Sequence, residues 1–350
     1  MRFYDIALFK PVEVAVILRM AKQEKIILET VSTSKKVAFL KDPHNYPEDA
    51  SSVSVIETHM SLLFLTPNRV YKLKKPVKFS SIDFSTPQAR HLNCLEELRL
   101  NKELAESVYL EVLPLNLDPS GKLNFGGKGK PVDWLVKMKR LEEKDLLNHA
   151  LLEKKVDKER LRSVAKLLAN FYRTREPVNF QPEDFLLRLE NKMKVNLKEL
   201  QDPQYGLSTD LLHRIFDQQI DFLRKHGNLF SKRVRAGRIV EAHGDLKPEH
   251  ICLSEEPVII DRLEFDRDLR IQDVAEELSF LATECELLGS PETGEVFFET
   301  YEAVTGDRIP LQLKNFYKSK QAFHRAKFAI WHLRAVSYTH LRAHETVLDL

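Results

Sequence analysis

The sequence is poor in cysteine and has no long apolar run. Its three cysteines, Cys94, Cys252 and Cys285, form no CxxC pair, so we expect neither a disulfide framework nor a zinc site, and a reducing, cytoplasmic location. The most apolar early segment, residues 12–18, contains Glu13 and is far shorter than the roughly 20 residues that a membrane span needs. No small-residue cleavage site follows it, as a signal peptide would require. We therefore expect no association with a membrane.

An excess of charge of one sign is also absent. Lys and Arg number 54 against 52 Asp and Glu, a net charge of +2, which gives no global attraction to nucleic acid. The basic run of Lys72, Lys74, Lys75 and Lys78 has no aromatic residues arranged beside it, so we interpret it as a solvated strand edge and expect no nucleic-acid binding. Glycine is scarce, and the GGKGK segment at 126–130 lacks the GxxxxGK[ST] pattern of a phosphate loop. It indicates a hairpin turn.

The first part of the chain mixes strand-like and helical patterns. Residues 1–52 end in the turn-forming cluster KDPHNYPEDASS and are predicted to be an N-terminal extension and linker. Residues 53–140 show a strand-like hairpin around the turn at 66–68, then a helix over 87–107, then a second hairpin. This order predicts a small α+β lobe. The predicted apolar face of the helix consists of Leu92, Leu95, Leu98 and Leu104.

Residues 141–335 are predicted to form a larger, helical lobe. Apolar residues recur at helical spacing over 157–174, and Ser208 or Thr209 could cap another helix that stops at Gly227. A further helix is expected over 271–288, and strand-like segments at 238–246, 250–253 and 257–261 lie before it. The segment 336–350 resembles a recurrent artefactual tail and is excluded from the predicted fold.

The stretch HGDLKPEHICLSEEPVIID at residues 243–261 carries the most specific chemical signal. Phosphoryl transfer needs a carboxylate that orients the attacking hydroxyl and accepts its proton, and oxygen ligands for a metal that bridges the nucleotide phosphates. Asp245, in a loop, fits the first role, and Asp261, at the end of an apolar strand, fits the second. Lys247 could offset the charge of the transferring phosphate. His250 stands where a second metal ligand is expected.

This stretch also resembles a known family. HGDLxxx(N/H), followed by an apolar strand that ends in Asp, is the signature of aminoglycoside phosphotransferases and their choline-kinase-like relatives in the protein-kinase-like superfamily. The blocks ETHMSLLFLTPNRVYKLKKPV, FSTPQARHLNCLEELRLNKELAESVYLEVLP and PVIIDRLEFDRDLRIQDVAEELSFLA look like an uncharacterised bacterial branch of that family, of which some members are fused to a P-loop kinase domain. The resemblance covers about residues 37–334.

The resemblance implies a fold, a reaction and its cofactors. The fold class is α+β, a protein-kinase-like two-lobe fold with a small β-rich N-lobe and a larger helical C-lobe. The implied reaction moves the γ-phosphoryl group of ATP to a hydroxyl of a small molecule, with Mg2+ or Mn2+. The resemblance also leaves open a P-loop kinase partner or domain outside this chain.

Roles carry over from the family onto matching positions of this sequence. YKLK resembles the strand that supplies the phosphate-binding lysine, with Lys74 as the first choice and Lys72 as the second. Glu97, or else Glu96, resembles the acidic partner of that lysine. Asp273 resembles the structural acid that opens the helix after the metal-binding strand.

Residues 136–140, which include Val136 and Met138, look like the connection between the lobes, whose backbone groups would bind adenine. Two features depart from the family pattern. His250 replaces the more common Asn, and imidazole is a poorer ligand for Mg2+ than a carbonyl oxygen. No GxGxxG loop covers the first hairpin.

Two alternatives to a small-molecule kinase stay open at this point. One is a catalytically silent nucleotide-binding module, which the histidine at position 250 and the missing glycine loop would suit. The other is a kinase-like enzyme that modifies proteins. Only about a dozen residues separate Asp261 from the next predicted helix, too few for the activation segment of a protein kinase, which favours a small-molecule acceptor.

Overall fold

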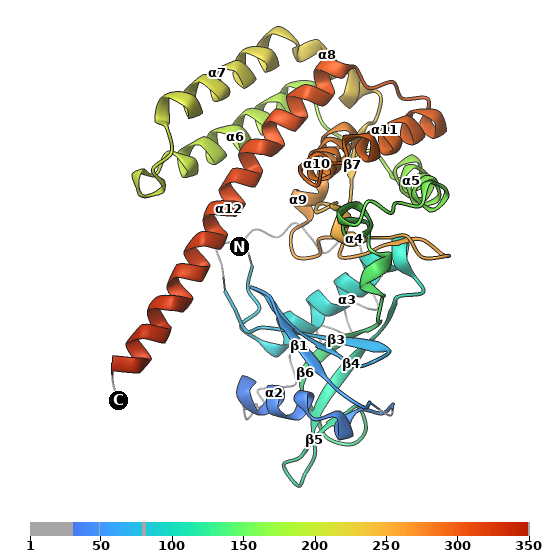
Figure 1. Cartoon of the computed structure of the whole chain (residues 1–350), viewed down its shortest axis with the longest axis vertical. Coiled ribbons are helices and arrows are strands. Elements are labelled where there is room, and N and C mark those ends of the chain that lie inside the picture. Colours follow the sequence, from blue (N-terminus) through green and yellow to red (C-terminus); the bar gives the residue numbers. More distant parts are fainter. Residues whose placement is uncertain (1–30, 49, 79–81, 349–350) are drawn as a thin grey trace.

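The strands before residue 140 form one six-stranded antiparallel sheet (Figure 1). The computed structural model describes residues 31–48, 50–78 and 82–348. Along the sheet the order is β1 (Ser54–Glu57), β2 (Ser61–Leu65), β3 (Arg69–Lys74), β6 (Lys130–Lys139), β4 (Tyr109–Leu117) and β5 (Leu123–Phe125). Because β3 lies in the middle of this order and pairs with both β2 and β6, the lysines it carries are held in a fixed register.

The segment 53–65, predicted as one strand, is two strands. The Thr58 side chain accepts a hydrogen bond from the Ser61 backbone N–H at 3.0 Å, and this local turn reverses the chain between β1 and β2. The second turn, at residues 66–68, lies where the sequence predicted it, since Thr66 makes the same contact with Arg69 at 3.0 Å. Three strands therefore precede the helix that was predicted over residues 87–107.

The described residues before 53 pack against the sheet instead of forming an extended linker. A helix, α2 (Thr33–Lys41), is followed by a short 3-10 turn, η1 (Pro43–Asn45). Leu40 and Tyr46 are buried in a cluster with Phe64 and Tyr71 of the sheet, and the rings of Tyr46 and Tyr71 lie 4.9 Å apart. The apolar residues of this segment thus belong to the core of the small lobe. The turn-rich sequence at 41–52 had led to the prediction of a linker instead.

Helix α3 (Pro87–Ala105) lies between the sheet and the helical lobe (Figure 1). Its N-cap is Thr86, whose side chain accepts a hydrogen bond from the Ala89 N–H at 3.1 Å. The predicted apolar face is wrong in part, because Leu92 and Leu95 are 54% and 43% exposed. The buried face carries polar residues instead, among them Arg90, Glu97 and Asn101.

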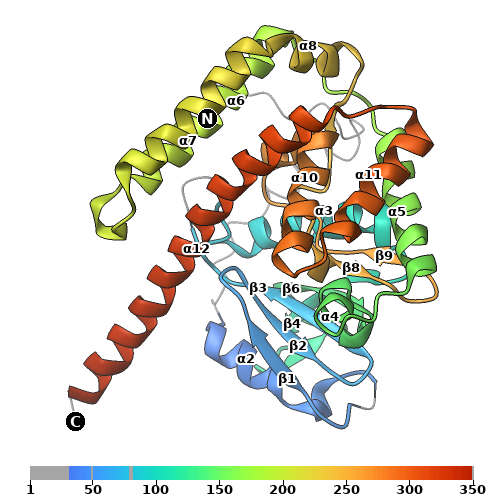
Figure 2. The same cartoon turned by 45° about the horizontal axis from the view of Figure 1, so that its top comes forward.

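The rest of the described chain forms the helical lobe (Figure 2). Its strands are short: β7 (Ile239–Glu241), β8 (Ile251–Cys252), β9 (Val258–Ile259) and β10 (Ile271–Asp273). Three 3-10 turns, η2 (Glu143–Asp145), η3 (Pro203–Tyr205) and η4 (Pro248–His250), accompany the helices. The helices are α4 (Leu147–Leu152), α5 (Lys158–Arg173), α6 (Pro182–Leu200), α7 (Thr209–Lys225), α8 (Gly227–Arg235), α9 (Arg267–Arg270), α10 (Val274–Leu287), α11 (Pro291–Thr305) and α12 (Leu311–Leu348).

Helices α6 and α7 run side by side, away from the sheet, and α12 packs against both before its C-terminal end reaches the level of the small lobe (Figures 1 and 2). The predicted tail, residues 336–350, falls at the end of α12 and beyond it, where the side chains lie outside the described residues. Within the described part of the chain, each helix is too short or too polar to cross a lipid bilayer.

The ends of helix α7 and the start of helix α10 can be compared with the predictions from the sequence. Ser208 caps α7, as one of the two alternatives had it, by accepting a hydrogen bond from the Leu211 N–H at 3.3 Å. The helix ends at Lys225, two residues before the predicted stop signal Gly227, which is also the first residue of α8. The helix predicted over 271–288 starts later, because residues 271–273 pair with β7 and Asp273 then caps α10.

A buried ion-pair network fixes the start of α10. The Arg233 guanidinium donates to Asp273 at 2.8 Å and to Asp307 at 2.5 Å, and the Tyr317 hydroxyl donates to Asp273 at 3.1 Å. All four side chains are buried. Asp273 thus has the structural position that the family resemblance implied.

We expect the change Asp273→Ala to lower the free energy of unfolding by about 3–5 kcal/mol. The change removes one of the two carboxylates that pair with the buried Arg233 guanidinium, and it also removes the N-cap of α10. Urea unfolding measures this loss. Lys225→Ala is the control, since its pair with Asp221 is exposed and such pairs contribute little. Equal unfolding midpoints for the two variants would contradict the account.

Candidate active site

A short hairpin brings the two ends of the 243–261 stretch together. Strands β8 and β9 pair antiparallel, with Ile251 opposite Ile259. The Ile260 N–H donates to the carbonyl oxygen of His250 at 2.9 Å, so residues 250 and 261 stand at the same end of the hairpin. The hairpin therefore brings the two predicted metal ligands, His250 and Asp261, into direct contact.

His250 and Asp261 present a donor pair that fits a divalent metal. The His250 Nδ1 lies 2.8 Å from the Asp245 carbonyl oxygen, which can only accept, so Nδ1 carries the proton and neutral imidazole has its lone pair on Nε2. Nε2 lies 3.5 Å from Asp261 Oδ2. Among the described residues no group of three or more His, Cys, Asp or Glu side chains gathers as a metal site. Mg2+ sites that use one or two protein ligands complete their shell with phosphate oxygens and water.

Asp261 is held in an unusual backbone conformation. Its φ is +58°, a left-handed value that costs energy for residues other than glycine but is tolerated by Asp. Its N–H donates to the hydroxyl of the buried Tyr109 at 3.1 Å. Burial acts to raise the pKa of Asp261, but Lys72, His250 and Lys74 together outweigh burial and hold the pKa well below its usual range. With 43% of its side chain exposed, the carboxylate is ionised and accessible to a ligand.

Two lysines of β3 share one buried glutamate. Lys72 lies 2.9 Å from Glu97 and 3.1 Å from Asp261, whereas Lys74 lies 2.5 Å from Glu97 and 2.5 Å from Glu264. Burial acts to lower the pKa of Lys72, but Asp261 and Glu97 outweigh it and raise the pKa well above its usual range. Lys72 keeps 14% of its side chain exposed and Lys74 only 1%, so of the two candidates Lys72 is the accessible one.

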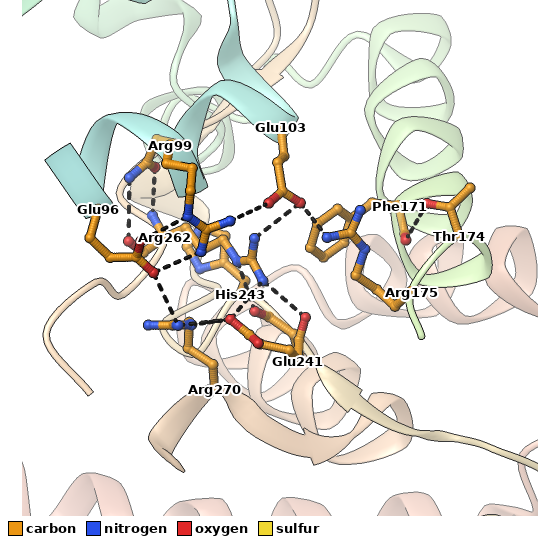
Figure 3. Close-up of polar contacts among 12 residues, drawn as sticks. Glu96, Arg99, Glu103, Phe171, Thr174, Arg175, Glu241, His243, Arg262 and Arg270 are labelled. Atoms are coloured by element: carbon orange, nitrogen blue, oxygen red, sulfur yellow. Dashed lines mark hydrogen bonds and ion pairs between the residues drawn. The ribbon is translucent and has the colours of Figure 1, made fainter. Parts of the chain in front are cut away.

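Glu96, the alternative to Glu97, faces elsewhere. It accepts hydrogen bonds from Arg99 at 2.7 Å and lies 3.6 Å from Arg270. Figure 3 shows it at the edge of a network in which Glu103 contacts Arg262 at 3.2 Å. This network joins α3 to the segment that follows Asp261.

Sequence reasoning missed two residues of this junction. The Asn101 amide accepts from the Arg262 backbone N–H at 2.8 Å and donates to its carbonyl oxygen at 3.4 Å. The Arg262 side chain, 1% exposed, donates to the Ala242 carbonyl oxygen at 2.9 Å. Asn101 lies one helical turn after Glu97 on the same face, which is the signal that could have identified it. The helix that carries Glu97 is thus fixed to the residue after Asp261.

The loop that carries Asp245 is built on a neutral histidine. His243 is fully buried; its Nε2–H donates to the Ile260 carbonyl oxygen at 2.9 Å, and its Nδ1 accepts from the Asp245 N–H at 3.3 Å. Burial lowers the pKa of His243 to about 3. At Gly244, φ is +92° and an added Cβ would lie 3.0 Å from the Arg270 side chain, so only glycine fits without strain.

Asp245 is partly exposed and lies beside a cation. Its carboxylate is 38% exposed and 3.2 Å from the Lys247 ammonium. Burial acts to lower the pKa of Lys247, but the carboxylates of Asp245, Glu249 and Asp261 together outweigh burial and raise it. The loop that leads into the hairpin of His250 and Asp261 thus presents a carboxylate and an ammonium side by side.

Val136 and Met138 lie inside the sheet and not in the connection between the lobes. Both belong to β6, where residues 136–138 pair with β3 on one side and β4 on the other. Their side chains are buried in one apolar cluster. Because the ladder uses their backbone groups, the connection begins only after Lys139, at residues 140–142.

A β-rich small lobe, a helical large lobe and charged residues that converge between them define a protein-kinase-like architecture. The model of the APH phosphotransferase enzyme family matches residues 67–309. The chain belongs to this family.

The chain is also similar to longer proteins. An uncharacterized protein of Mycobacterium tuberculosis is 32% identical over 282 residues, which cover 80% of this chain and 55% of that protein. An uncharacterized protein of Mycobacterium bovis matches to the same extent. The chain spans about half the length of these curated relatives.

Solved structures align with most of the chain at low identity. A choline/ethanolamine kinase family protein from Mesorhizobium loti is 14% identical, with a TM-score of 0.48 and coverage of 87% of both chains. The aminoglycoside phosphotransferase APH(3'')-Id from Streptomyces rimosus, in complex with ADP and streptomycin, is 14% identical, with a TM-score of 0.43 and coverage of 82% of this chain and 97% of that one. These similarities concern the fold alone.

The depressed pKa of His243 makes stability depend on pH. The unfolded chain binds a proton at this residue below about pH 6.5, whereas the folded chain does so only near pH 3, so stability falls as the pH is lowered through this window. We expect His243 to account for a loss of about 1.6 kcal/mol between pH 6.5 and pH 5. Urea unfolding at both pH values of the wild type and of His243→Gln measures it, and an equal pH dependence of the two proteins would refute it.

Proposed function

We propose that the protein is a metal-dependent kinase that transfers the γ-phosphoryl group of ATP to a hydroxyl of a small molecule. The observation that carries this proposal is the convergence of Lys72 from the sheet, Asp261 from the large lobe and His250 from the loop that presents Asp245. A cation for phosphate, two metal ligands and a partly exposed base are the groups that phosphoryl transfer requires.

Lys72 is the better candidate for the phosphate-binding lysine, the reverse of the order expected from the sequence. Its ammonium reaches Asp261, where metal-bound phosphates would lie, and it remains partly exposed. Lys74 is enclosed between Glu97 and Glu264, so its proposed role is to hold Glu97 in place. Adenine would contact the connection at residues 140–142, since the backbone groups of Val136 and Met138 are engaged in the sheet.

His250 Nε2 and the Asp261 carboxylate would hold the metal ion. When bound, Mg2+ or Mn2+ would neutralise charge on the nucleotide phosphates. The Lys72 ammonium, already within 3.1 Å of Asp261, would add its charge on the other side of the same carboxylate.

Asp245 would act as the base. The oxygen of the acceptor hydroxyl attacks the γ-phosphorus, the bond from that phosphorus to the β–γ bridging oxygen breaks, and ADP leaves with the bond electrons. The hydroxyl proton passes to the Asp245 carboxylate. Lys247, 3.2 Å from that carboxylate, would offset charge on the transferring group.

The segment after Asp261 supports a small acceptor. It consists of a loop, the four-residue helix α9 and the short strand β10 before α10 begins at Val274. This leaves no room for the long segment on which protein kinases dock peptides. Assays of ATP binding, of ADP formation and of phosphate on the protein distinguish this function from a silent nucleotide-binding module and from a protein-modifying enzyme.

Three variants test the proposed roles by ADP formation with a panel of hydroxyl compounds. We expect Asp245→Asn to lower acceptor-dependent ADP formation by at least about 100-fold with little change in ATP affinity, since it removes only the base. Lys72→Met should weaken both ATP binding and turnover. Lys74→Met is the matched control on the same strand face and should mainly lower stability.

Equal ADP formation by wild type and Asp245→Asn would refute the kinase proposal. ATP binding without turnover in the wild type would indicate a silent module. Phosphate found by mass spectrometry on the protein, with no product from the panel, would indicate a protein-modifying enzyme.

The metal preference tests the role of His250. Replacing imidazole by an amide oxygen in His250→Asn should favour Mg2+ over Mn2+, because Mg2+ prefers oxygen ligands. We expect the ratio of the concentrations of the two ions that give half-maximal activity to change by at least about threefold. Glu249→Gln, at the neighbouring position, is the control, and an unchanged ratio in His250→Asn would contradict metal binding by this side chain.

A further inference from the structure

Glu277, in the first turn of α10, is a buried carboxylate in contact with the catalytic loop. It is 1% exposed. Its Oε2 accepts hydrogen bonds from the His243 backbone N–H at 3.0 Å and from the Tyr172 hydroxyl at 2.5 Å. Its Oε1 accepts from the Gly244 backbone N–H at 2.6 Å and from the Gln272 side-chain amide at 2.7 Å. Each oxygen thus receives two hydrogens.

These contacts suit a carboxylate and not an amide. Each oxygen of Glu277 accepts from a backbone N–H, which can only donate, so the NH2 group of an amide in its place would face a backbone N–H whichever way the amide was turned. Burial raises the pKa of Glu277 above its ordinary value, and the hydrogen bonds from Tyr172 and the two backbone N–H groups offset only part of this rise. Among the described residues Glu277 forms no direct ion pair, so its hydrogen bonds come from neutral donors, and the Arg262 charge acts on it only from a distance.

Two of those donors belong to the residues that precede Asp245. Gly244 has a left-handed φ of +92°, a conformation that keeps neighbouring N–H groups directed to one side, as in anion-binding turns. The carboxylate of Glu277 occupies the anion position of this turn. The direction in which the chain enters Asp245 therefore depends on the charge of Glu277.

We propose that Glu277 is a positioning residue for the proposed kinase, which sets the backbone of His243 and Gly244 and thereby the orientation of the Asp245 carboxylate toward the acceptor. The effect on catalysis rests on the proposed function. The claim that the Glu277 carboxylate orders this backbone rests only on the four hydrogen bonds.

The neighbouring residue provides a matched control. Glu276 is also buried, at 3% exposed, and lies on the same turn of α10. Its contacts are with Lys320 and Gln321 of α12, away from the catalytic loop. A change from Glu to Gln at either position removes one buried charge from α10, but only the change at 277 touches the loop.

The experiment compares Glu277→Gln, Glu276→Gln and Tyr172→Phe with the wild type. Glu277→Gln should lower kcat by at least about tenfold with KM for ATP changed by less than about twofold, since a displaced base affects the chemical step. Tyr172→Phe, which removes one donor and leaves the carboxylate, should give a smaller loss of kcat. Glu276→Gln should retain kcat even where its melting temperature falls. A kcat near that of the wild type in a folded Glu277→Gln, or an equal loss in Glu276→Gln, would overturn the proposal.

Hydrogen exchange provides a readout that does not need activity. Exchange of the Gly244 and His243 amides should be at least about tenfold faster in Glu277→Gln than in the wild type, and unchanged in Glu276→Gln. If the wild type turns over no acceptor, the proposed function fails, but this comparison still decides the positioning role. Unchanged exchange at these two amides in Glu277→Gln would overturn it.

Discussion

The buried carboxylate of Glu97 is the constraint on which the rest of the site depends. Its side chain is inaccessible to solvent, and its two oxygens are divided between Lys72 and Lys74. An uncompensated charge in this position would cost several kcal/mol, so strand β3 and helix α3 must keep their register. The same two ammonium groups contact Asp261 and Glu264 of the large lobe. One carboxylate therefore ties the sheet, the helix and the loop between the lobes to each other.

Hydrogen bonds to backbone groups fix the large lobe to the helix that carries Glu97. Asn101 binds the peptide groups of Arg262, and the Arg262 side chain donates to the carbonyl oxygen of Ala242, just before the proposed catalytic loop. His243 then connects that loop back to Ile260. Each of these contacts is made by a buried group, so the proposed metal ligands and the proposed base are positioned relative to Glu97 before any ligand binds.

The sequence was sufficient to predict much of this arrangement. The two-lobe fold, the long helices and the pairing of a loop carboxylate with one at a strand end followed from apolar periodicity and from the HGDLKPEH motif. The choice between Lys72 and Lys74 did not, because residues two apart on a strand share one face and only the position of Asp261 distinguishes them. Val136 was misplaced because a central strand and a following connection look alike in an apolar run.

The remaining misses have a common physical origin. The inward faces of α3 and α10 are rich in charged and polar residues, whereas sequence periodicity assumes that the inward face is apolar. Asn101 and Glu277 are buried because backbone groups of another segment satisfy them, and such partners, distant in the sequence, leave no local pattern. Buried polar side chains with distant backbone partners are therefore what the structure adds to the sequence.

Calorimetric titration of ATP with Mg2+ tests most directly the central claim, that nucleotide and metal meet between Lys72 and Asp261. We expect ATP to bind the wild type and to bind Asp261→Asn at least about tenfold more weakly, a loss of about 1.4 kcal/mol. The affinity should be unchanged in the exposed control Asp268→Asn. Equal affinities in all three proteins would contradict the account, because the nucleotide would then bind elsewhere.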